Sequence, residues 1–210
     1  MSTDQLRSAK AQLRRRMQAE LARLSAAEIQ HHSADITAAV QQTAAWHNAE
    51  IVLAFVSLRG EVATAALCRA TLDSGKLLGL PRVTAAGLVF HRVDSWPFSA
   101  VRSAYGIREP APDTPQIDLR GRTRLLVITP GLAFDRHGGR LGRGGAYYDR
   151  LFSSLQSRPM WSSTAVGFEL QLVDEVPTGP TDRRVHAVVT ELQSLIIPDA
   201  DGSSQTAQTR

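Results

Sequence analysis

The residues best suited to chemistry in this chain lie at positions 130–152, in the stretch PGLAFDRHGGRLGRGGAYYDRLF. Five of the chain's fifteen glycines fall within eight residues of it, at Gly138, Gly139, Gly142, Gly144 and Gly145. Four arginines accompany them, namely Arg136, Arg140, Arg143 and Arg150. Glycine lets a backbone approach a ligand and present its N–H groups, and arginine offers planar pairs of donors that match phosphate oxygens. The stretch therefore predicts a site for a polyphosphate.

This glycine–arginine loop matches neither common nucleotide-binding pattern. A Walker A loop requires a lysine that is absent here, and a GxGxxG fingerprint fails because Ala146 and Tyr147 follow Gly144 and Gly145. A flexible surface loop without a ligand remains an alternative. The arginines, the adjacent tyrosines and Asp149 count against it, since a carboxylate beside a phosphate can hold Mg²⁺.

Candidate side chains also lie outside the loop. Lys10 and Arg14 are one helical turn apart and can reach the same anion, although a solvated basic face has the same spacing. Glu61 follows a glycine and can accept hydrogen bonds from an N–H-rich heterocycle, or it can simply complement a helix dipole. Asp182 is either a second metal carboxylate or an Asx-turn residue.

Other chemistries have little support in the sequence. The six histidines show no HExxH spacing, and there is no GxSxG elbow for a serine nucleophile. The single cysteine, Cys68, lies in the apolar segment AALCRATL, which favours a small core residue over a nucleophile. One cysteine also excludes an internal disulfide and a multi-cysteine metal site.

Composition bounds the class of protein. The chain has 210 residues, 43% of them hydrophobic and 21% charged, which is typical of a soluble globular domain. A net charge of +4 and a pI near 9.8 permit nucleic-acid binding without requiring it. No apolar run approaches the ~20 residues of a membrane span, and no secretory signal opens the chain. We expect a cytoplasmic monomer that acts on small molecules, with no nucleic-acid or membrane partner.

Helical and strand patterns alternate along the chain. The apolar spacing predicts helices over 4–24, 25–44, 64–74 and 147–155, the second opened by a capping box of Ser25 and Glu28 and the third closed by Gly75. Apolar runs predict strands at 51–56, 76–80, 88–93, 125–128, 163–168 and, as the last strand, 185–190. Pro81 should stop the second of these strands, and 96–110 should be irregular.

This order of elements predicts an α/β fold. We expect one domain at 1–197 with a largely parallel sheet and helices on both faces, an open three-layer α/β/α arrangement, and a disordered tail at 198–210. In such a sheet the ligand site lies at the carboxyl ends of the strands. The glycine–arginine loop, the loop SLRGE at 57–61 and the segment REP at 108–110 all flank strands, so they can converge there.

Several motifs together resemble the 5-formyltetrahydrofolate cyclo-ligase family, also called methenyltetrahydrofolate synthetase. The stretch PGLAFDRHGGRLGRGGAYYDR looks like the family's glycine-rich signature. Supporting matches follow in the same order, namely KAQLRRRM at 10–17, FVSLRGEVAT at 55–64, LPRV at 80–83, YGIREP at 105–110 and VGFELQLVDEVP with TDRRVHAVVTE within 166–191. The resemblance covers roughly residues 7–195.

The resemblance implies an ATP-dependent ring closure of 5-formyltetrahydrofolate to 5,10-methenyltetrahydrofolate, with Mg²⁺. The implied ATP-binding residues are Lys10, Arg14, Arg140, Leu141, Gly142, Arg143, Gly144, Gly145, Ala146, Tyr147 and Tyr148. The implied folate-binding residues are Val56, Glu61, Arg143, Gly144, Gly145, Ala146 and Tyr147. Arg14, Arg143 and Tyr147 are the implied catalytic residues, and Asp149 and Asp182 would hold Mg²⁺.

The chain departs from the family pattern within the loop. Ala146 stands where the family usually has glycine, so the backbone there must avoid positive φ or carry strain. Outside the loop, Ala63 and Thr129 replace a frequent aspartate and a usual aliphatic residue. Two rival hypotheses remain open: a homologue that binds ATP but acts on another substrate or has no cyclo-ligase activity, and a basic nucleic-acid-binding module.

Overall fold

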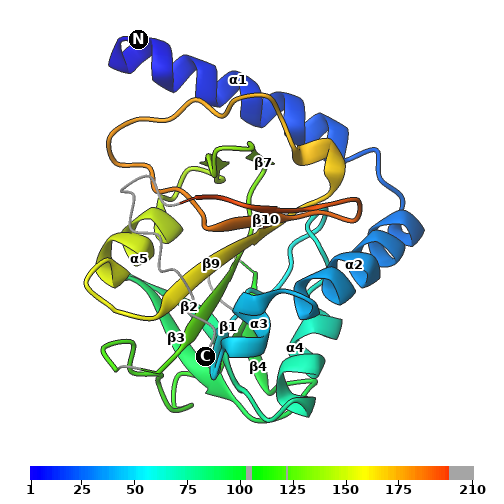
Figure 1. The fold of residues 1–210 in the computed structure, drawn as a ribbon, viewed down its shortest axis with the longest axis vertical. Coiled ribbons are helices and arrows are strands. Elements are labelled where there is room, and N and C mark those ends of the chain that lie inside the picture. Colours follow the sequence, from blue (N-terminus) through cyan, green and yellow to red (C-terminus); the bar gives the residue numbers. More distant parts are fainter. Residues whose placement is uncertain (103–105, 122, 199–210) are drawn as a thin grey trace, which may run out of the picture.

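A computed structural model of the chain describes residues 1–198 apart from 103–105 and 122, and it is built around one seven-stranded sheet (Figure 1). The helices are α1 (Thr3–Leu21), α2 (Ala26–Gln41), α3 (Ala44–Asn48), α4 (Ala65–Asp73), α5 (Tyr147–Leu155) and the 3₁₀ turn η1 (Glu169–Gln171). The strands are β1 (Ile51–Leu53), β2 (Leu77–Thr84), β3 (Gly87–Val93), β4 (Ala100–Arg102), β5 (Arg108–Pro110), β6 (Leu125–Thr129), β7 (Ala133–Phe134), β8 (Arg140–Leu141), β9 (Trp161–Val166), β10 (Ala187–Val189) and β11 (Ser194–Ile196).

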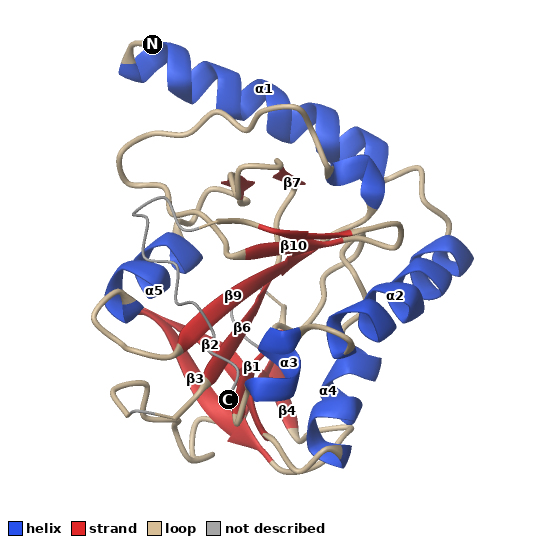
Figure 2. Cartoon of the chain, in the orientation of Figure 1, coloured by secondary structure: helices blue, strands red, loops and turns tan. Residues whose placement is uncertain are grey.

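The large sheet has the order β11-β10-β9-β6-β1-β2-β3. Its five central strands pair in parallel, and each edge strand, β3 or β11, pairs antiparallel with its neighbour. Helices α2, α3 and α4 lie on one side of the sheet and α5 on the other (Figure 2). The predicted α/β class with a largely parallel sheet and helices on both faces is confirmed.

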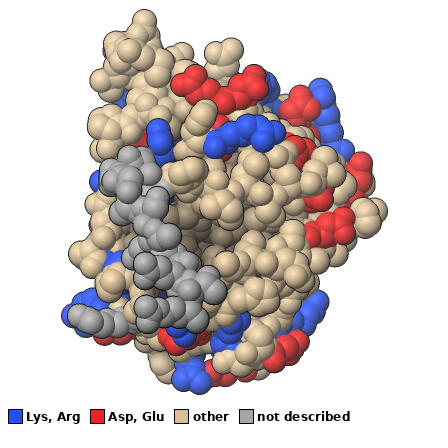
Figure 3. Space-filling model, viewed as in Figure 1, with Lys and Arg blue, Asp and Glu red and all other residues tan. Residues whose placement is uncertain are grey.

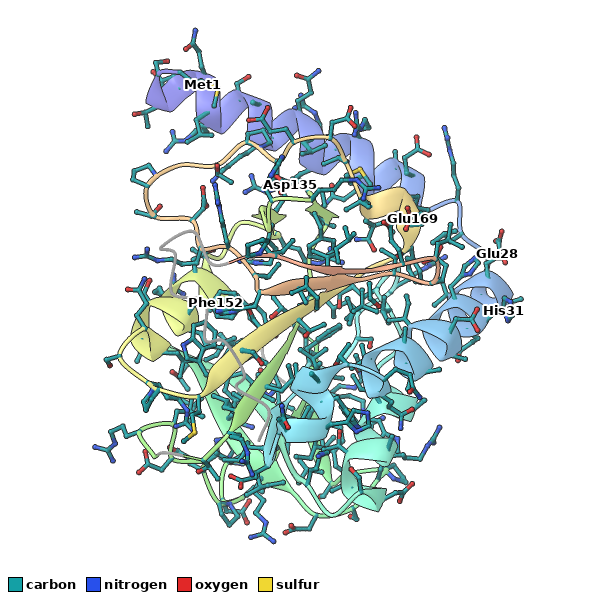
Figure 4. The ribbon with its side chains drawn as sticks, in the orientation of Figure 1. Met1, Glu28, His31, Asp135, Phe152 and Glu169 are labelled. Atoms are coloured by element: carbon teal, nitrogen blue, oxygen red, sulfur yellow. The ribbon has the colours of Figure 1, made fainter. Side chains whose placement is uncertain are left out.

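Two of the hydrophobic clusters lie on opposite faces of the sheet and hold the layers together. Side chains alternate along a strand, so Val52 of β1 packs with α1–α4 while Ile51 and Leu53 pack with α5. Phe152, which is labelled on α5 in Figure 4, is buried in the second core beside Trp161 of β9, with 5.4 Å between the ring centroids. Apolar residues on both sides of each central strand explain why these strands are short continuous apolar runs in the sequence.

Local signals set the helix boundaries. The capping box of Ser25 and Glu28 opens α2 as predicted, and a similar box of Ser2 with Gln5 opens α1. Gly75, with φ of 70°, follows the end of α4 in the left-handed conformation that favours glycine. Gly75 thus lies where the chain passes from α4 to β2.

The sheet has a topological switch point between β1 and β6. After β1 the chain crosses one face through α4 to β2, and after β6 it crosses the other face through α5 to β9. Because these connections diverge, the carboxyl ends of β1 and β6 leave a crevice between them, which is where open α/β sheets bind ligands.

The structure corrects three predicted elements. Strand β2 continues through Pro81 to Thr84, because beyond Gly79 it has left its partner β1 and only β3 pairs with it, so a missing N–H is tolerated. The segment expected to be irregular contains the antiparallel pair β4–β5, although residues 103–105 lie outside the described part. The strand β10 is not the last, since β11 pairs antiparallel with it.

The remaining sequence expectations concern the ends and the membrane. Residues 199–210 lie outside the described part of the chain, so the structure says nothing about the tail predicted to be disordered. Within the described residues, no helix combines the length and the apolar character that crossing a bilayer requires.

Candidate active site

A cleft of about 410 Å³ opens at the switch point. It is bounded by the loops that follow β1 and β6, by α1, and by the outer parts of β2 and β3. All fifteen residues proposed from the sequence line it, namely Lys10, Arg14, Val56, Glu61, Arg140, Leu141, Gly142, Arg143, Gly144, Gly145, Ala146, Tyr147, Tyr148, Asp149 and Asp182. Residues from four separate segments are therefore brought to one cavity.

The first half of the glycine–arginine loop is a small hairpin of β7 and β8. Asp135, labelled in Figure 4, is buried and accepts backbone N–H groups from His137, Gly139 and Val176 through its carboxylate. A Cβ at position 139 would lie 2.3 Å from Oδ2 of Asp135, so glycine is required for this close approach. Asp135 thus shapes the hairpin that delivers the next arginine to the cleft.

Arg140 forms the buried floor of the loop. Its side chain is 3% exposed, and Nη2 donates to Oδ2 of Asp149 over 3.0 Å. The guanidinium also lies over the ring of Tyr148, 5.5 Å from the centroid. Its Nε is buried without a hydrogen-bond partner among the described residues, which leaves one donor of this cation unsatisfied within the cleft wall.

Helix α5 begins at the end of the loop in an unusual conformation. Ala146 precedes its first residue with φ of 50° and ψ of 24°, in the left-handed region. A Cβ at position 145 would lie 2.6 Å from the ring of Tyr147, which explains the glycine there. From the sequence we expected the backbone at Ala146 either to avoid positive φ or to carry strain. The observed φ is positive, so the backbone is strained there.

Helix α1 brings its cations to the opposite wall. Lys10 Nζ lies 2.5 Å from Oδ2 of Asp182, which also accepts the N–H of Gly179. Arg14 Nε donates to the carbonyl of Gly142 over 2.9 Å. Both side chains point into the cleft region, so the alternative of a solvated basic face does not describe them.

Glu61 stands in the loop after β1. Its Oε2 accepts the N–H of Leu58 over 2.9 Å, and its Oε1 accepts Nε of Arg143 over 3.0 Å. Glu61 is 10% exposed in its side chain. Because it precedes α4 by several residues and faces the cleft, it does not act as a helix-start charge.

Sequence reasoning missed the apolar half of the cleft. Its lining includes Phe55, Leu58, Pro81, Val83, Leu88 and Ile107, together with Arg108, Glu109, Pro130, Gly131 and Thr181. The segments LPRV and REP flanked strands and were recognisable as motifs, but nothing in the sequence showed that β2 runs past Pro81. Only that extension brings Val83 and Leu88 beside the loop after β1.

Two buried groups are held neutral. Burial, assisted by the nearby Glu61 carboxylate, raises the pKa of the Tyr148 phenol well above its ordinary value of 10.0. Burial likewise raises the pKa of the Cys68 thiol to about 12, and Cys68 packs in a core with Leu78 and Leu80. Tyr148 therefore faces the cleft as a neutral donor, and Cys68 has the core role expected from the sequence.

The donor set in the cleft restricts the metal that it could hold. No group of three histidine, cysteine or acidic side chains with metal-binding geometry occurs in the described residues. Two aspartates, Asp149 and Asp182, line the cleft, and Oδ1 of Asp149 accepts the backbone N–H of Arg183, the residue after Asp182. Mg²⁺ commonly takes one or two carboxylates and completes its shell with phosphate oxygens and water, so this set fits Mg²⁺ beside a polyphosphate.

Charges on the surface are mixed. In the view of Figure 3, lysine and arginine atoms alternate with aspartate and glutamate atoms around the rim, and the described atoms of this face show no large area of one sign. The described atoms of this face therefore form no basic stripe.

Comparisons with known proteins agree on one family. The sequence model of the 5-formyltetrahydrofolate cyclo-ligase family matches residues 6–191. The 5-formyltetrahydrofolate cyclo-ligase of Escherichia coli strain K12 is 35% identical over 148 residues, which cover 68% of this chain and 78% of that protein. The mouse cyclo-ligase is 28% identical over 200 residues, 91% of this chain and 98% of that protein. The solved structure of Aquifex aeolicus 5,10-methenyltetrahydrofolate synthetase superimposes with a TM-score of 0.77 at 26% identity, covering 96% of this chain and 99% of that one.

Proposed function

The chain belongs to the 5-formyltetrahydrofolate cyclo-ligase family, and from this we infer that it is an ATP-dependent cyclo-ligase. It converts 5-formyltetrahydrofolate to 5,10-methenyltetrahydrofolate and releases ADP and phosphate. The observation that supports this assignment is the cleft at the switch point, which is lined both by the glycine–arginine loop and by an apolar wall.

The reaction needs activation because a formyl group attached to nitrogen is a poor electrophile. We propose that the formyl oxygen attacks the γ-phosphorus of ATP, which breaks the bond to the bridging oxygen and releases ADP. The resulting N5-iminium phosphate carries its former formyl oxygen as a leaving group. N10 then forms a bond to the same carbon, phosphate leaves with that oxygen, and the N10 proton is lost. The protein's task is to align the two substrates and neutralise charge.

The glycine–arginine loop and α1 would hold the triphosphate. Lys10, Arg14, Arg140 and Arg143 bring four cations to the cleft, and the glycines between them leave backbone N–H groups accessible. The orphaned Nε of Arg140 supports this role, since a buried donor without a partner lacks the hydrogen bond that an anion would supply. Tyr147 lies at the first turn of α5, where an anion is favoured.

The apolar half would hold the folate. A reduced pterin is a flat heterocycle with N–H groups along one edge, which suits apolar walls and one carboxylate acceptor. Val56 and Glu61 lie together in the loop region after β1 and line the cleft. Arg143, at 3.0 Å from Glu61, stands between the two halves and so would reach both substrates.

Mg²⁺ would bind beside the phosphates through Asp149 and Asp182. When bound, Mg²⁺ neutralises developing charge on the transferred phosphoryl group. In the structure each carboxylate is paired with a cation, Asp149 with Arg140 and Asp182 with Lys10. A ligand that brings both Mg²⁺ and phosphates can replace the two sets of partners at once, because the cations turn to phosphate oxygens as the carboxylates turn to the metal.

The direct test is a spectrum. The methenyl product absorbs in the near ultraviolet and 5-formyltetrahydrofolate does not, so the purified chain with that folate, ATP and Mg²⁺ should produce the band, and omission of ATP should abolish it. If pure substrates give no band while the chain still binds ATP, the rival of a homologue with another substrate is favoured. The mixed charge on the face shown in Figure 3 supports small-molecule substrates over nucleic acid, and random DNA and RNA should not shift in a binding assay. Light scattering should give the mass of a monomer, 22.8 kDa.

A further inference from the structure

The small two-stranded unit β4–β5 packs against the part of β2 that extends beyond β1. We infer that Glu109, on β5, is a positioning residue for the folate half of the cleft: it fastens this unit to β2 and thereby fixes the apolar wall against which the heterocycle packs. The inference rests on the proposed function, and it concerns a residue that lies in the sequence motif REP but to which the sequence patterns gave no role.

Glu109 is held by contacts on both oxygens. It is only 3% exposed, yet it lines the cleft. Its Oε1 accepts the backbone N–H of Val83 over 3.2 Å, and its Oε2 lies 3.7 Å from Nη1 of Arg82. The same Nη1 donates to the carbonyl of Pro110, so the carboxylate and the strand that carries it are both tied to consecutive residues of β2.

The outer part of β2 needs this attachment because it has a strand on one side only. As far as Gly79, strand β2 lies between β1 and β3, but from Leu80 to Thr84 it pairs with β3 alone. A strand with one open side presents N–H groups that must find another acceptor. At Val83 that acceptor is the Glu109 carboxylate, which takes the place of a neighbouring strand.

The fastened segments make one wall of the cleft. Pro81 and Val83 from β2, Leu88 from β3 and Ile107 beside β5 all line it, facing Phe55 after β1. A flat ring gains binding energy from such walls only if their separation is fixed before it enters, because ordering them on binding costs affinity. The phosphate half rests on different elements, α1, β8 and α5, so loosening Glu109 should affect one substrate and spare the other.

The test uses steady-state kinetics with each substrate varied in turn. Glu109→Ala removes both contacts and leaves the Val83 N–H without its acceptor, so we expect the KM for 5-formyltetrahydrofolate to rise about tenfold while the KM for ATP changes less than about twofold. Glu109→Gln keeps an acceptor for Val83 but loses the charge beside Arg82, and it should fall between the wild type and the alanine variant.

A matched control is available in the same chain. Glu50 also accepts a backbone N–H and an arginine, those of Arg124 at 3.1 Å and 2.9 Å, but it does not line the cleft. Glu50→Ala should leave both KM values unchanged. If Glu109→Ala does not fold, the KM values of Glu109→Gln and Arg82→Ala provide the test, because each of these substitutions removes only some of the contacts between β5 and β2.

The outcomes separate the two claims. Equal rises in both KM values, or no rise in the folate KM in any of these variants, would overturn the positioning role. Failure of the wild-type chain to form the methenyl band would instead overturn the proposed function. Calorimetric binding of 5-formyltetrahydrofolate and of a non-hydrolysable ATP analogue gives the same selective comparison without turnover, with the folate Kd expected to rise alone.

Discussion

Arg143 donates from Nε to Oε1 of Glu61 over 3.0 Å, and this one ion pair joins the loop after β6 to the loop after β1 across the mouth of the cleft. The arginine is 42% exposed and the glutamate 10% exposed in their side chains. Ion pairs with an exposed partner contribute little to stability, so ligand groups can replace this one at small cost. The pair therefore connects the sites proposed for ATP and for folate without locking them.

Replacing the carboxylate of this pair should affect the folate first. We expect Glu61→Gln to raise the KM for 5-formyltetrahydrofolate by about tenfold or more, because a charged acceptor of N–H bonds is lost, while the KM for ATP stays within about twofold. Initial rates of methenyl formation measure both constants. Glu20→Gln, which breaks the exposed pair with Arg23, is the control and should change neither. A larger effect on ATP than on folate would contradict the assignment of Glu61.

Lys10 should affect the nucleotide instead. Lys10→Ala removes a cation from the triphosphate wall and releases Asp182, so the KM for ATP should rise about tenfold or more with little change in the folate KM. Arg16→Ala, on an exposed position of the same helix, lowers the charge of α1 equally and should have no such effect. If both variants weaken ATP alike, long-range charge and not a local contact is responsible.

Asp149 should control the need for Mg²⁺. Asp149→Asn removes one proposed ligand and should shift the Mg²⁺ dependence of the rate to concentrations about tenfold higher or more. The same change weakens the contact with buried Arg140, so the free energy of unfolding should fall by about 1–3 kcal/mol. Urea denaturation monitors the second effect, and Asp174→Asn at an exposed site is the control. An unchanged Mg²⁺ requirement in a folded variant would place the metal elsewhere.

Ala146 should be a source of strain that glycine relieves. At φ of 50° an alanine occupies the left-handed region at a cost that glycine does not have, so Ala146→Gly should raise the free energy of unfolding by about 0.5–1 kcal/mol. The opposite sign is expected for Ala34→Gly in the middle of α2, which should lose about 0.5–1 kcal/mol. Both follow from urea denaturation curves, and destabilisation by Ala146→Gly would show that the methyl group packs usefully.

Much of the fold was predictable because its signals are local. The helix α2 follows from the Ser25 and Glu28 box, α4 ends at Gly75 by backbone conformation, and α5 begins after a loop too rich in glycine to be helical. The parallel sheet follows from alternation of apolar strands with helices. The extent of β2 and the presence of β4, β5 and β11 were not predicted from the sequence. A proline is excluded from a strand only if both sides of that strand are paired. Strand pairing is not a local property of the sequence.

The sequence by itself determined which side chains are proposed to carry the chemistry. The glycines and arginines of 138–145, Lys10, Glu61 and the two aspartates were identified from residue type, spacing and a family resemblance. The tertiary structure decided how the side chains of the cleft are paired: Lys10 with Asp182 across 172 residues, Arg143 with Glu61 across 82, and Glu109 with the open edge of β2. Such contacts depend on where the strands of the sheet end and on where the crossover connections diverge. No local pattern in the sequence encodes the distances between these side chains.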